Sequence, residues 1–375
     1  MTHRQRVLQA LRHQQPDRVP IDLAGTFAST ITLGGYERLK EYLRIEKETI
    51  VMSKRSQVAQ PHEEVLRYFD IDTRGIQPRG PAGWVDRLFP DGSYQDEWGV
   101  IRSRPPGGGH FYVSGPPFAG EPSVEDIRKH PWPDPFDPGF VEGIAGEAQR
   151  LHQETDFAVV LNLPVGFVHQ AQFLRGYEEW LTDLLLHPVF AEALMDKVLE
   201  IQRIIGERMI EAGNGHFDLL FYGDDLAFQG GPMMSLELYR KMIKPRHRQL
   251  FSHLKSKARV PLVFHSCGSV YPLLEDLIEI GVDCINPVQV SAKDMDTRRL
   301  KEEFGDRMAF WGAIDTHRVL PFGTPEEVRA EVKRRIEDLA PGGGYILNSV
   351  HNLQPEVPPE NIMAMFEAAK EFGKY

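Results

Sequence analysis

Eight short apolar segments, separated by stretches with helical periodicity, constrain the fold of this chain more than any other feature of its sequence. Most of them are continuous rather than alternating, which is typical of strands in a parallel sheet whose two faces are both covered. The segments are residues 19–25, 74–77, 158–162, 219–223, 260–265, 284–287, 308–312 and 345–348. Eight strands that alternate with helices favour a (β/α)₈ TIM barrel over an open doubly wound sheet.

The segments between these strands carry recognisable helix and turn signals. Residues 324–339 begin with Thr324 as the N-cap, Pro325 in the first turn and Glu327 three residues after the cap, and residues 271–280 are also amphipathic. Residues 88–138 are rich in Pro and Gly, so we expect an insertion outside the barrel, with a hairpin over 94–104 and 110–113. The sequence contains no GxGxxG or P-loop pattern, and we interpret residues 1–375 as a single domain.

Composition limits the class of partner and the compartment. The net charge of −11 argues against a nucleic acid or an anionic membrane surface as the main partner. Only two cysteines are present, which favours a reducing compartment over a disulfide framework. There is no apolar signal core after Met1 and no run of about 20 apolar residues, so we expect a cytoplasmic protein.

A histidine and a cysteine lie where the fifth predicted strand ends. His265 and Cys267 are two residues apart, and positions i and i+2 of an extended segment face the same way. Imidazole nitrogen and thiolate sulfur are preferred zinc ligands, and Gly268 followed by a helix N-terminus would lower the pKa of the thiol. The alternative is a buried thiol beside a core histidine.

The eighth predicted strand is followed by His351, which would meet His265 and Cys267 across the barrel mouth or would cap backbone groups in a surface loop. Cys284 lies inside an apolar strand, and we expect it to serve packing. The sequence therefore gives His265, Cys267 and His351 as a candidate metal-ligand set.

Acidic residues follow several strands and are candidates for catalysis. Asp224 and Asp225 end the fourth strand, and Asp22 has a similar position on the first. Paired carboxylates on a barrel rim suit general acid–base catalysis or metal binding, although one of them could cap the next helix instead. Asp315 and His317 are further candidates on the rim, or solvated loop residues.

Several motifs together resemble the uroporphyrinogen decarboxylase-like superfamily along nearly the whole chain. They are residues 4–11 followed by 16–20, Gly223-Asp224-Asp225-Leu226, His265-Ser266-Cys267-Gly268-Ser269, Gly281-Val282-Asp283 with Asn286-Pro287-Val288-Gln289, Phe310-Trp311-Gly312 and residues 358–362. The resemblance implies a TIM barrel with its site at the carboxyl ends of the strands. It also implies a homodimer as one assembly, because relatives of the decarboxylase branch form dimers.

Two branches of this superfamily imply different chemistry. Resemblance to the uroporphyrinogen decarboxylases proper implies an enzyme that needs no metal. The arginines of their N-terminal signature are missing here, because residues 22–27 read Asp-Leu-Ala-Gly-Thr-Phe. Arginine is the natural clamp for carboxylates, so its absence weakens that activity. The corrinoid-linked methyltransferases imply zinc held by His-x-Cys and a later cysteine, whose place His351 takes here.

The resemblance therefore implies a zinc-dependent enzyme that moves a methyl group between a small molecule and a corrinoid (cobalamin) carried by a separate partner protein. The chain has no Asp-x-His-x-x-Gly motif for cobalamin of its own. Asp224 or Asp225 would supply an acid, a base or a fourth ligand. Two alternatives are a metal-free decarboxylase that uses Asp22 and His351, and a tetrapyrrole- or corrinoid-binding protein without catalysis.

Overall fold

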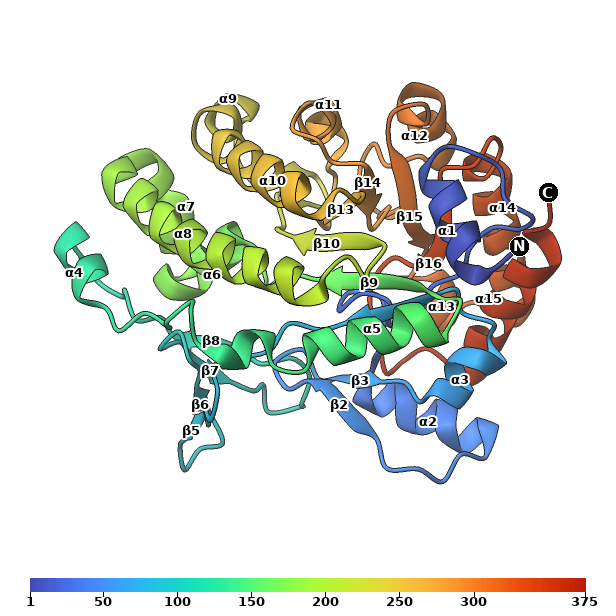
Figure 1. Ribbon diagram of the computed structural model, residues 1–375, viewed down its shortest axis with the longest axis horizontal. Helices are drawn as coiled ribbons and strands as arrows, with labels where there is room; N and C mark the ends of the chain where they lie inside the picture. The colour runs from blue at the N-terminus through green and yellow to red at the C-terminus, as the bar shows by residue number, and fades with distance from the viewer.

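The computed structural model describes residues 1–375 and places a parallel sheet at the centre of the molecule (Figure 1). Seven strands pair in the order β16-β15-β14-β13-β10-β9-β4, and every pair is parallel. The strands are β4 (Thr73–Ile76), β9 (Ala158–Asn162), β10 (Leu219–Gly223), β13 (Leu262–His265), β14 (Cys284–Asn286), β15 (Ala309–Ile314) and β16 (Tyr345–Ser349). Each of them overlaps a strand predicted from the sequence.

The first predicted strand closes the sheet between β16 and β4. The Leu347 N–H donates to the Pro20 carbonyl, and the Asp22 N–H donates to the Leu347 carbonyl, at 2.8 and 2.9 Å. On its other side, the Asp72 N–H donates to the Ile21 carbonyl at 2.9 Å. The predicted eight-segment barrel is therefore confirmed, with the first segment held by a few bonds rather than by a full ladder.

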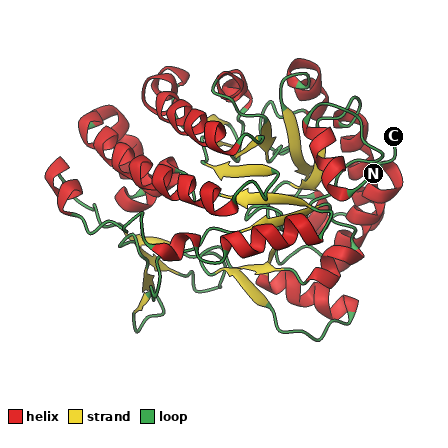
Figure 2. Ribbon diagram, viewed as in Figure 1, coloured by secondary structure: helices red, strands yellow, loops and turns green.

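Helices surround the strands on the outside (Figure 2). They are α1 (His3–Leu11), α2 (Leu33–Leu43), α3 (Glu63–Tyr68), α4 (Val124–Lys129), α5 (Ile144–Glu154), α6 (Phe167–Arg175), α7 (Tyr177–Leu186), α8 (Pro188–Gly213), α9 (Leu236–Leu238), α10 (Lys244–Ala258), α11 (Leu274–Glu279), α12 (Thr297–Phe304), α13 (Val319–Phe322), α14 (Pro325–Leu339) and α15 (Pro359–Phe372). Short non-α turns are η1 (Pro138–Val141), η2 (Tyr239–Ile243) and η3 (Tyr271–Leu273). No helix combines the length and the apolar character that crossing a membrane requires.

The helix signals in the sequence are largely confirmed. Thr324 and Glu327 form the predicted capping box at the start of α14. The helix expected over 271–280 is divided, because its first turn is the 3₁₀ turn η3 with Pro272 in it and α11 begins only at Leu274. Proline has no N–H to donate, so it is tolerated in this first turn.

Two apolar clusters explain why the strands are continuous apolar runs. A cluster of 12 buried residues fills the barrel interior, and it includes Phe221, Cys284 and Trp311. A second cluster of 84 buried residues lies between the sheet and the helices. Because both faces of each strand are buried, the period-2 alternation of a half-exposed strand is absent. Cys284 is fully buried within the interior cluster, so its predicted packing role is confirmed.

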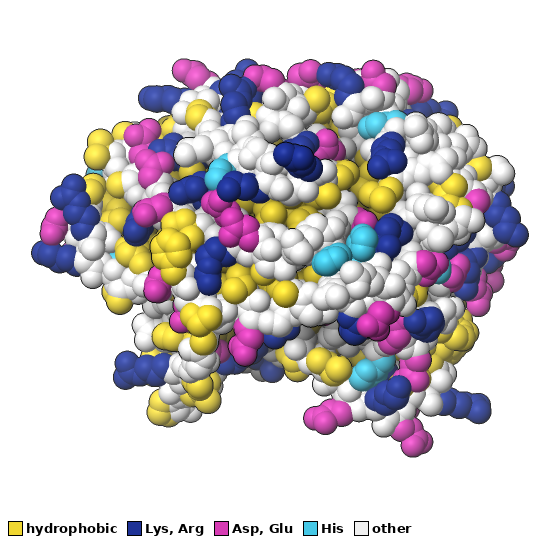
Figure 3. All heavy atoms as spheres, in the orientation of Figure 1, with side chains coloured by type: hydrophobic (Ala, Val, Ile, Leu, Met, Phe, Trp, Pro, Cys, Tyr) yellow, Lys and Arg dark blue, Asp and Glu magenta, His cyan; other side chains and the backbone are white.

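The predicted insertion forms a small antiparallel sheet outside the barrel. Its strands pair in the order β5 (Arg87–Leu88), β6 (Tyr94–Gln95), β7 (Ile101–Ser103) and β8 (Tyr112–Gly115), so the expected hairpin is present. A second small sheet, β1 (Ile31–Thr32), β3 (Val58–Gln60) and β2 (Ile50–Ser53), was not predicted. Acidic and basic side chains are mixed on the face shown in Figure 3.

Candidate metal and catalytic site

Three side chains that could bind a metal meet at the carboxyl-terminal end of the barrel. His265 is the last residue of β13, Cys267 follows two residues later, and His351 lies two residues after the end of β16. The candidate ligand atoms of these three residues all lie within 4.8 Å of one another. Strands β14 and β15 separate β13 from β16, so the contact spans part of the barrel mouth. The structure thus brings together the three residues that the sequence selected.

The His265 ring is held in one orientation by Asn286 at the end of β14. His265 Nδ1 lies 2.6 Å from Asn286 Oδ1, while Asn286 Nδ2 donates to the Trp311 carbonyl at 3.3 Å. Because Nδ2 of the amide is occupied as a donor, Oδ1 accepts, and His265 Nδ1 carries the proton. The lone pair is then on Nε2, which lies 3.5 Å from Cys267 Sγ. Burial lowers the pKa of His265, so the ring stays neutral and able to bind a cation.

Cys267 is fixed through its backbone. Its N–H donates to Asp225 Oδ1 at 2.7 Å, and the next N–H, of Gly268, donates to Gln289 Oε1 at 2.7 Å. Gly268 has a φ of +91°, and a Cβ there would contact the Ala227 carbonyl, so a glycine is required. Our expectation that this segment lowers the thiol pKa is wrong: burial and the Asp225 carboxylate raise the pKa of Cys267, and no helix begins at Gly268.

His351 completes the cluster as a neutral imidazole. Its ring centroid lies 5.6 Å from that of His265, with the two rings nearly perpendicular. Burial, followed by the nearby His265, lowers the pKa of His351 to about 3. The loop that carries it is held by Ser349, whose hydroxyl donates to the His351 carbonyl at 2.7 Å. Two neutral imidazoles beside a thiol form a ligand set that zinc accepts.

Asp225 is the carboxylate nearest this cluster. Its Oδ1 lies 3.8 Å from His265 Nε2, and its Oδ2 lies 3.4 Å from His169 Nε2. Burial alone would raise the pKa of Asp225, but His169, His265 and the Cys267 N–H lower it well below the usual range. Asp225 is therefore an ionised carboxylate at the edge of the cluster.

His169 is a site residue that sequence reasoning missed. It lies in the first turn of α6, seven residues after the end of β9. Burial would lower its pKa, but Asp225 and Asp224 raise it by a larger amount, so Asp225 stabilises the protonated form when His169 takes up a proton. Its position after a barrel strand was the available signal, since the loops that follow strands carry function in barrels.

Asp224 lies behind the site and stabilises the start of α6. It is fully buried and accepts hydrogen bonds from the His169 N–H at 2.9 Å and the Tyr222 hydroxyl at 3.2 Å. Its Oδ2 also lies 3.0 Å from His247 Nε2. All these contacts are to the scaffold, so Asp224 positions His169 rather than facing the mouth.

The other predicted acids do not contact the cluster. Asp22 is fully buried and accepts from the Gly25 N–H at 2.9 Å, the Thr73 hydroxyl, and the Trp311 indole at 3.1 Å. Burial raises the pKa of Asp22. Asp315 accepts from the His317 N–H at 2.8 Å, and His317 Nδ1 lies 3.1 Å from the Ser291 hydroxyl. The structure therefore separates these residues from His265, Cys267 and His351.

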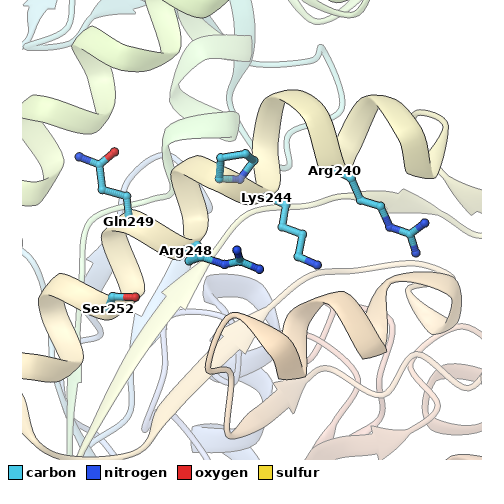
Figure 4. Close-up of a pocket in the computed structure, with 6 residues that line it drawn as sticks. Arg240, Lys244, Arg248, Gln249 and Ser252 are labelled. Atoms are coloured by element: carbon cyan, nitrogen blue, oxygen red, sulfur yellow. The ribbon is translucent and has the colours of Figure 1, made fainter.

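A hollow of about 470 Å³ is lined by residues of η2 and α10, none of which belongs to this site (Figure 4). It carries Arg240, Lys244 and Arg248. Asp276 lies 3.0 Å from Arg240 and 2.7 Å from Lys244, and Glu279 pairs with Lys244 and Arg248. Each of the three basic groups therefore already has a carboxylate partner.

Comparisons with known proteins agree with this architecture. The family described as "Uroporphyrinogen decarboxylase (URO-D)" matches residues 112–372. A methylated-thiol–coenzyme M methyltransferase of Methanosarcina mazei is 25% identical over 69% of this chain and 65% of the relative. A uroporphyrinogen decarboxylase of Alkalilimnicola ehrlichii is 26% identical over 67% of both chains. The aligned parts thus cover about two thirds of these relatives' own length.

A solved structure gives the same fold. A methyltransferase from Methanosarcina mazei superposes with a TM-score of 0.66 over 99% of both chains, at 18% identity. The relatives named above are enzymes of two kinds, a methyltransferase and a decarboxylase. The fold, the strand-end cluster and the family match over residues 112–372 lead to one conclusion: the chain belongs to the uroporphyrinogen decarboxylase family.

Proposed function

We propose that this chain is a zinc-dependent methyltransferase that moves a methyl group between a small molecule and a corrinoid bound to a separate protein. The observation that carries the proposal is the cluster of His265, Cys267 and His351, whose ligand atoms lie within 4.8 Å of one another. The methyltransferase among the relatives supports the reaction class. Asn286 supports the metal, because it fixes His265 with Nε2 turned toward Cys267.

The donor set fits zinc. His265 Nε2, Cys267 Sγ and one His351 nitrogen would hold the ion, leaving a fourth position for substrate, as catalytic zinc sites do. When bound, zinc acts as a Lewis acid that lowers the pKa of a substrate thiol or hydroxyl group, or polarises the atom that carries the methyl group. A His/Cys/His set carries one thiolate, so it is less negative than a set with two. We expect this difference to favour an oxygen-bound methyl group or another weakly basic acceptor.

Asp225 and His169 would manage the proton in this proposal. Asp225 Oδ2 and His169 Nε2 lie 3.4 Å apart at the edge of the cluster. His169 can hold the proton that the substrate loses on binding, while Asp225 stabilises the resulting imidazolium. Asp224 keeps this pair in place through the His169 N–H. The chain would bind its corrinoid partner over the same mouth, where the transferred methyl group is within reach.

Metal content tests the proposal. Elemental analysis of the purified protein should give about one zinc per chain. Cys267→Ala and His351→Ala should lose the zinc with the fold intact. Cys284→Ala is the matched control, because Cys284 is buried inside the barrel and away from the cluster, and its zinc content should stay unchanged. Equal zinc in Cys267→Ala and in the unaltered protein would remove the proposed ligand set.

A metal-free decarboxylase is the second candidate, favoured by the relatives named uroporphyrinogen decarboxylase. It would use the buried Asp22 as an acid, together with His351. This candidate predicts protein without metal, carbon dioxide release from a carboxylated substrate, and loss of that activity in Asp22→Asn. A third outcome is that the protein binds a corrinoid equally well with and without Cys267 and shows no turnover. That outcome would indicate a corrinoid-binding protein without catalytic activity.

A further inference from the structure

A pocket of about 650 Å³ lies between the small sheet of the insertion and the helices α6 and α7. Its wall combines basic side chains with aromatic ones: Arg55, Arg102, His110, Phe111, Tyr112 and Phe173. Such a combination is suited to a ligand with an apolar body and an anionic group.

Arg55 stands out because its guanidinium has no direct partner, although the nearby carboxylates of Asp96 and Glu97 attract it from farther away. Arg102 Nε lies 2.7 Å from Asp96 Oδ2, whereas the Arg55 side chain forms neither a hydrogen bond nor an ion pair. Both guanidinium groups instead lie over the Phe173 ring, at 5.1 Å for Arg55 and 4.6 Å for Arg102. Burial and the neighbouring Arg102 lower the pKa of Arg55 to about 10. A partly buried cation beside another cation is costly unless an anion joins it.

The pocket lies next to the candidate metal site. The Phe173 ring stacks on His169, with centroids 5.8 Å apart, and His169 contacts Asp225. On another wall, the charge of His110 contributes to the lowered pKa of His351. The pocket wall and the candidate metal site therefore share a boundary at Phe173 and His169.

We propose that this pocket binds the small-molecule substrate and that Arg55 recognises an oxyanion group of it, such as a carboxylate. Guanidinium is planar and binds a carboxylate through two parallel hydrogen bonds, while the aromatic wall covers the apolar part. Glu178 and Glu179, which also line the pocket, are exposed and do not pair with Arg55. The identification of the ligand as the substrate rests on the proposed methyltransferase function. The existence of the anion site does not depend on that function.

Calorimetric titration with benzoate tests the proposal, with benzamide as the uncharged analogue. Benzoate should bind the unaltered protein, and Arg55→Met should weaken that binding at least about tenfold, the scale of a lost charge-assisted contact. Arg55→Lys should keep part of the affinity, because the charge remains without the fork. Arg87→Met is the matched control, since Arg87 is an exposed arginine of the same small sheet outside the pocket, and it should change nothing. Melting temperatures check that each variant is folded.

Three results would overturn the anion site: no benzoate binding, equal binding to Arg55→Met, or equally tight binding of benzamide. Repeating the titration in the Cys267→Ala background separates this proposal from the methyltransferase proposal. Benzoate binding that still depends on Arg55 there supports the pocket whatever the zinc content is. If zinc binding depends on Cys267 as expected but benzoate binding does not depend on Arg55, only the proposed anion site is overturned.

Discussion

Replacing Asn286 by alanine should weaken zinc binding without touching a proposed ligand. Asn286 Oδ1 accepts from His265 Nδ1 at 2.6 Å, and this contact leaves Nε2 as the free nitrogen. Without the acceptor, the His265 ring can rotate, and its proton can move to Nε2, where it would block the metal. Losses of such outer contacts weaken metal affinity about 10- to 100-fold, or about 1.4–2.7 kcal/mol.

The same substitution should also lower stability, so a control must separate the two effects. A buried N–H that loses its acceptor costs about 1–3 kcal/mol of unfolding free energy. Asn162→Ala is matched, because Asn162 is equally buried, ends strand β9 and hydrogen-bonds only to backbone groups of Gly25, Phe27, Ile76 and Val160. Both variants should unfold more easily, while only Asn286→Ala should lose zinc affinity.

Competition with a chelator at fixed pH measures the zinc affinity, and denaturant titration of the metal-free proteins measures the stability. The reasoning would be refuted by equal zinc affinity in Asn286→Ala and the unaltered protein. It would also be refuted by equal losses of affinity in the Asn286 and Asn162 variants, since the effect would then follow stability rather than the orientation of His265.

Two further predictions concern stability. The hydrogen bond from Arg6 lowers the pKa of Asp17 to about 2, so Asp17 stabilises the fold above pH about 4, and this contribution disappears as the pH falls toward 2. Asp17 is 44% exposed and screened by solvent, so Asp17→Asn should cost about 1 kcal/mol or less at neutral pH, with melting temperatures that converge with those of the unaltered protein in acid. Gly166→Ala would place a Cβ inside the Asp224 carboxylate and should destabilise by about 3 kcal/mol in denaturant titration, within the range for overpacking. Gly146→Ala, in an open helical position of α5, should instead stabilise by about 0.5–1 kcal/mol, and similar effects of the two alanines would contradict the predicted clash.

The barrel and the ligand cluster could be predicted because their signals are local. A strand buried on both faces needs a continuous apolar run, and β9 and β10 begin and end at the residues predicted for them. Parallel strands place their carboxyl ends on one rim, so a His-x-Cys after one strand and a histidine after another were expected to meet. The 4.8 Å limit on their separation is consistent with that expectation.

The sequence alone could not distinguish the role of Asp224 from that of Asp225, but the geometry of the strand end distinguishes them. Neighbouring residues of an extended segment point to opposite sides, so one carboxylate faces the mouth and the other the helix layer. Asp225 contacts the Cys267 N–H, and Asp224 contacts the His169 N–H at the start of α6. His169 was missed because it lies within a helix, and no local pattern marks which turn of a helix leans over the mouth.

The candidate metal site and the proposed anion site lie in different parts of the chain relative to the family match. The match covers residues 112–372 and includes His265, Cys267 and His351. Arg55, Arg102 and His110, which supply the basic wall of the pocket, all lie before it. Loops and insertions on a barrel rim change more readily than strands, because they carry little of the core. We therefore expect the reaction to depend on the matched part of the chain. The choice of substrate should depend on the loops and the small sheet that carry Arg55, Arg102 and His110, so exchanging these parts should alter which anion binds while leaving the zinc content unchanged.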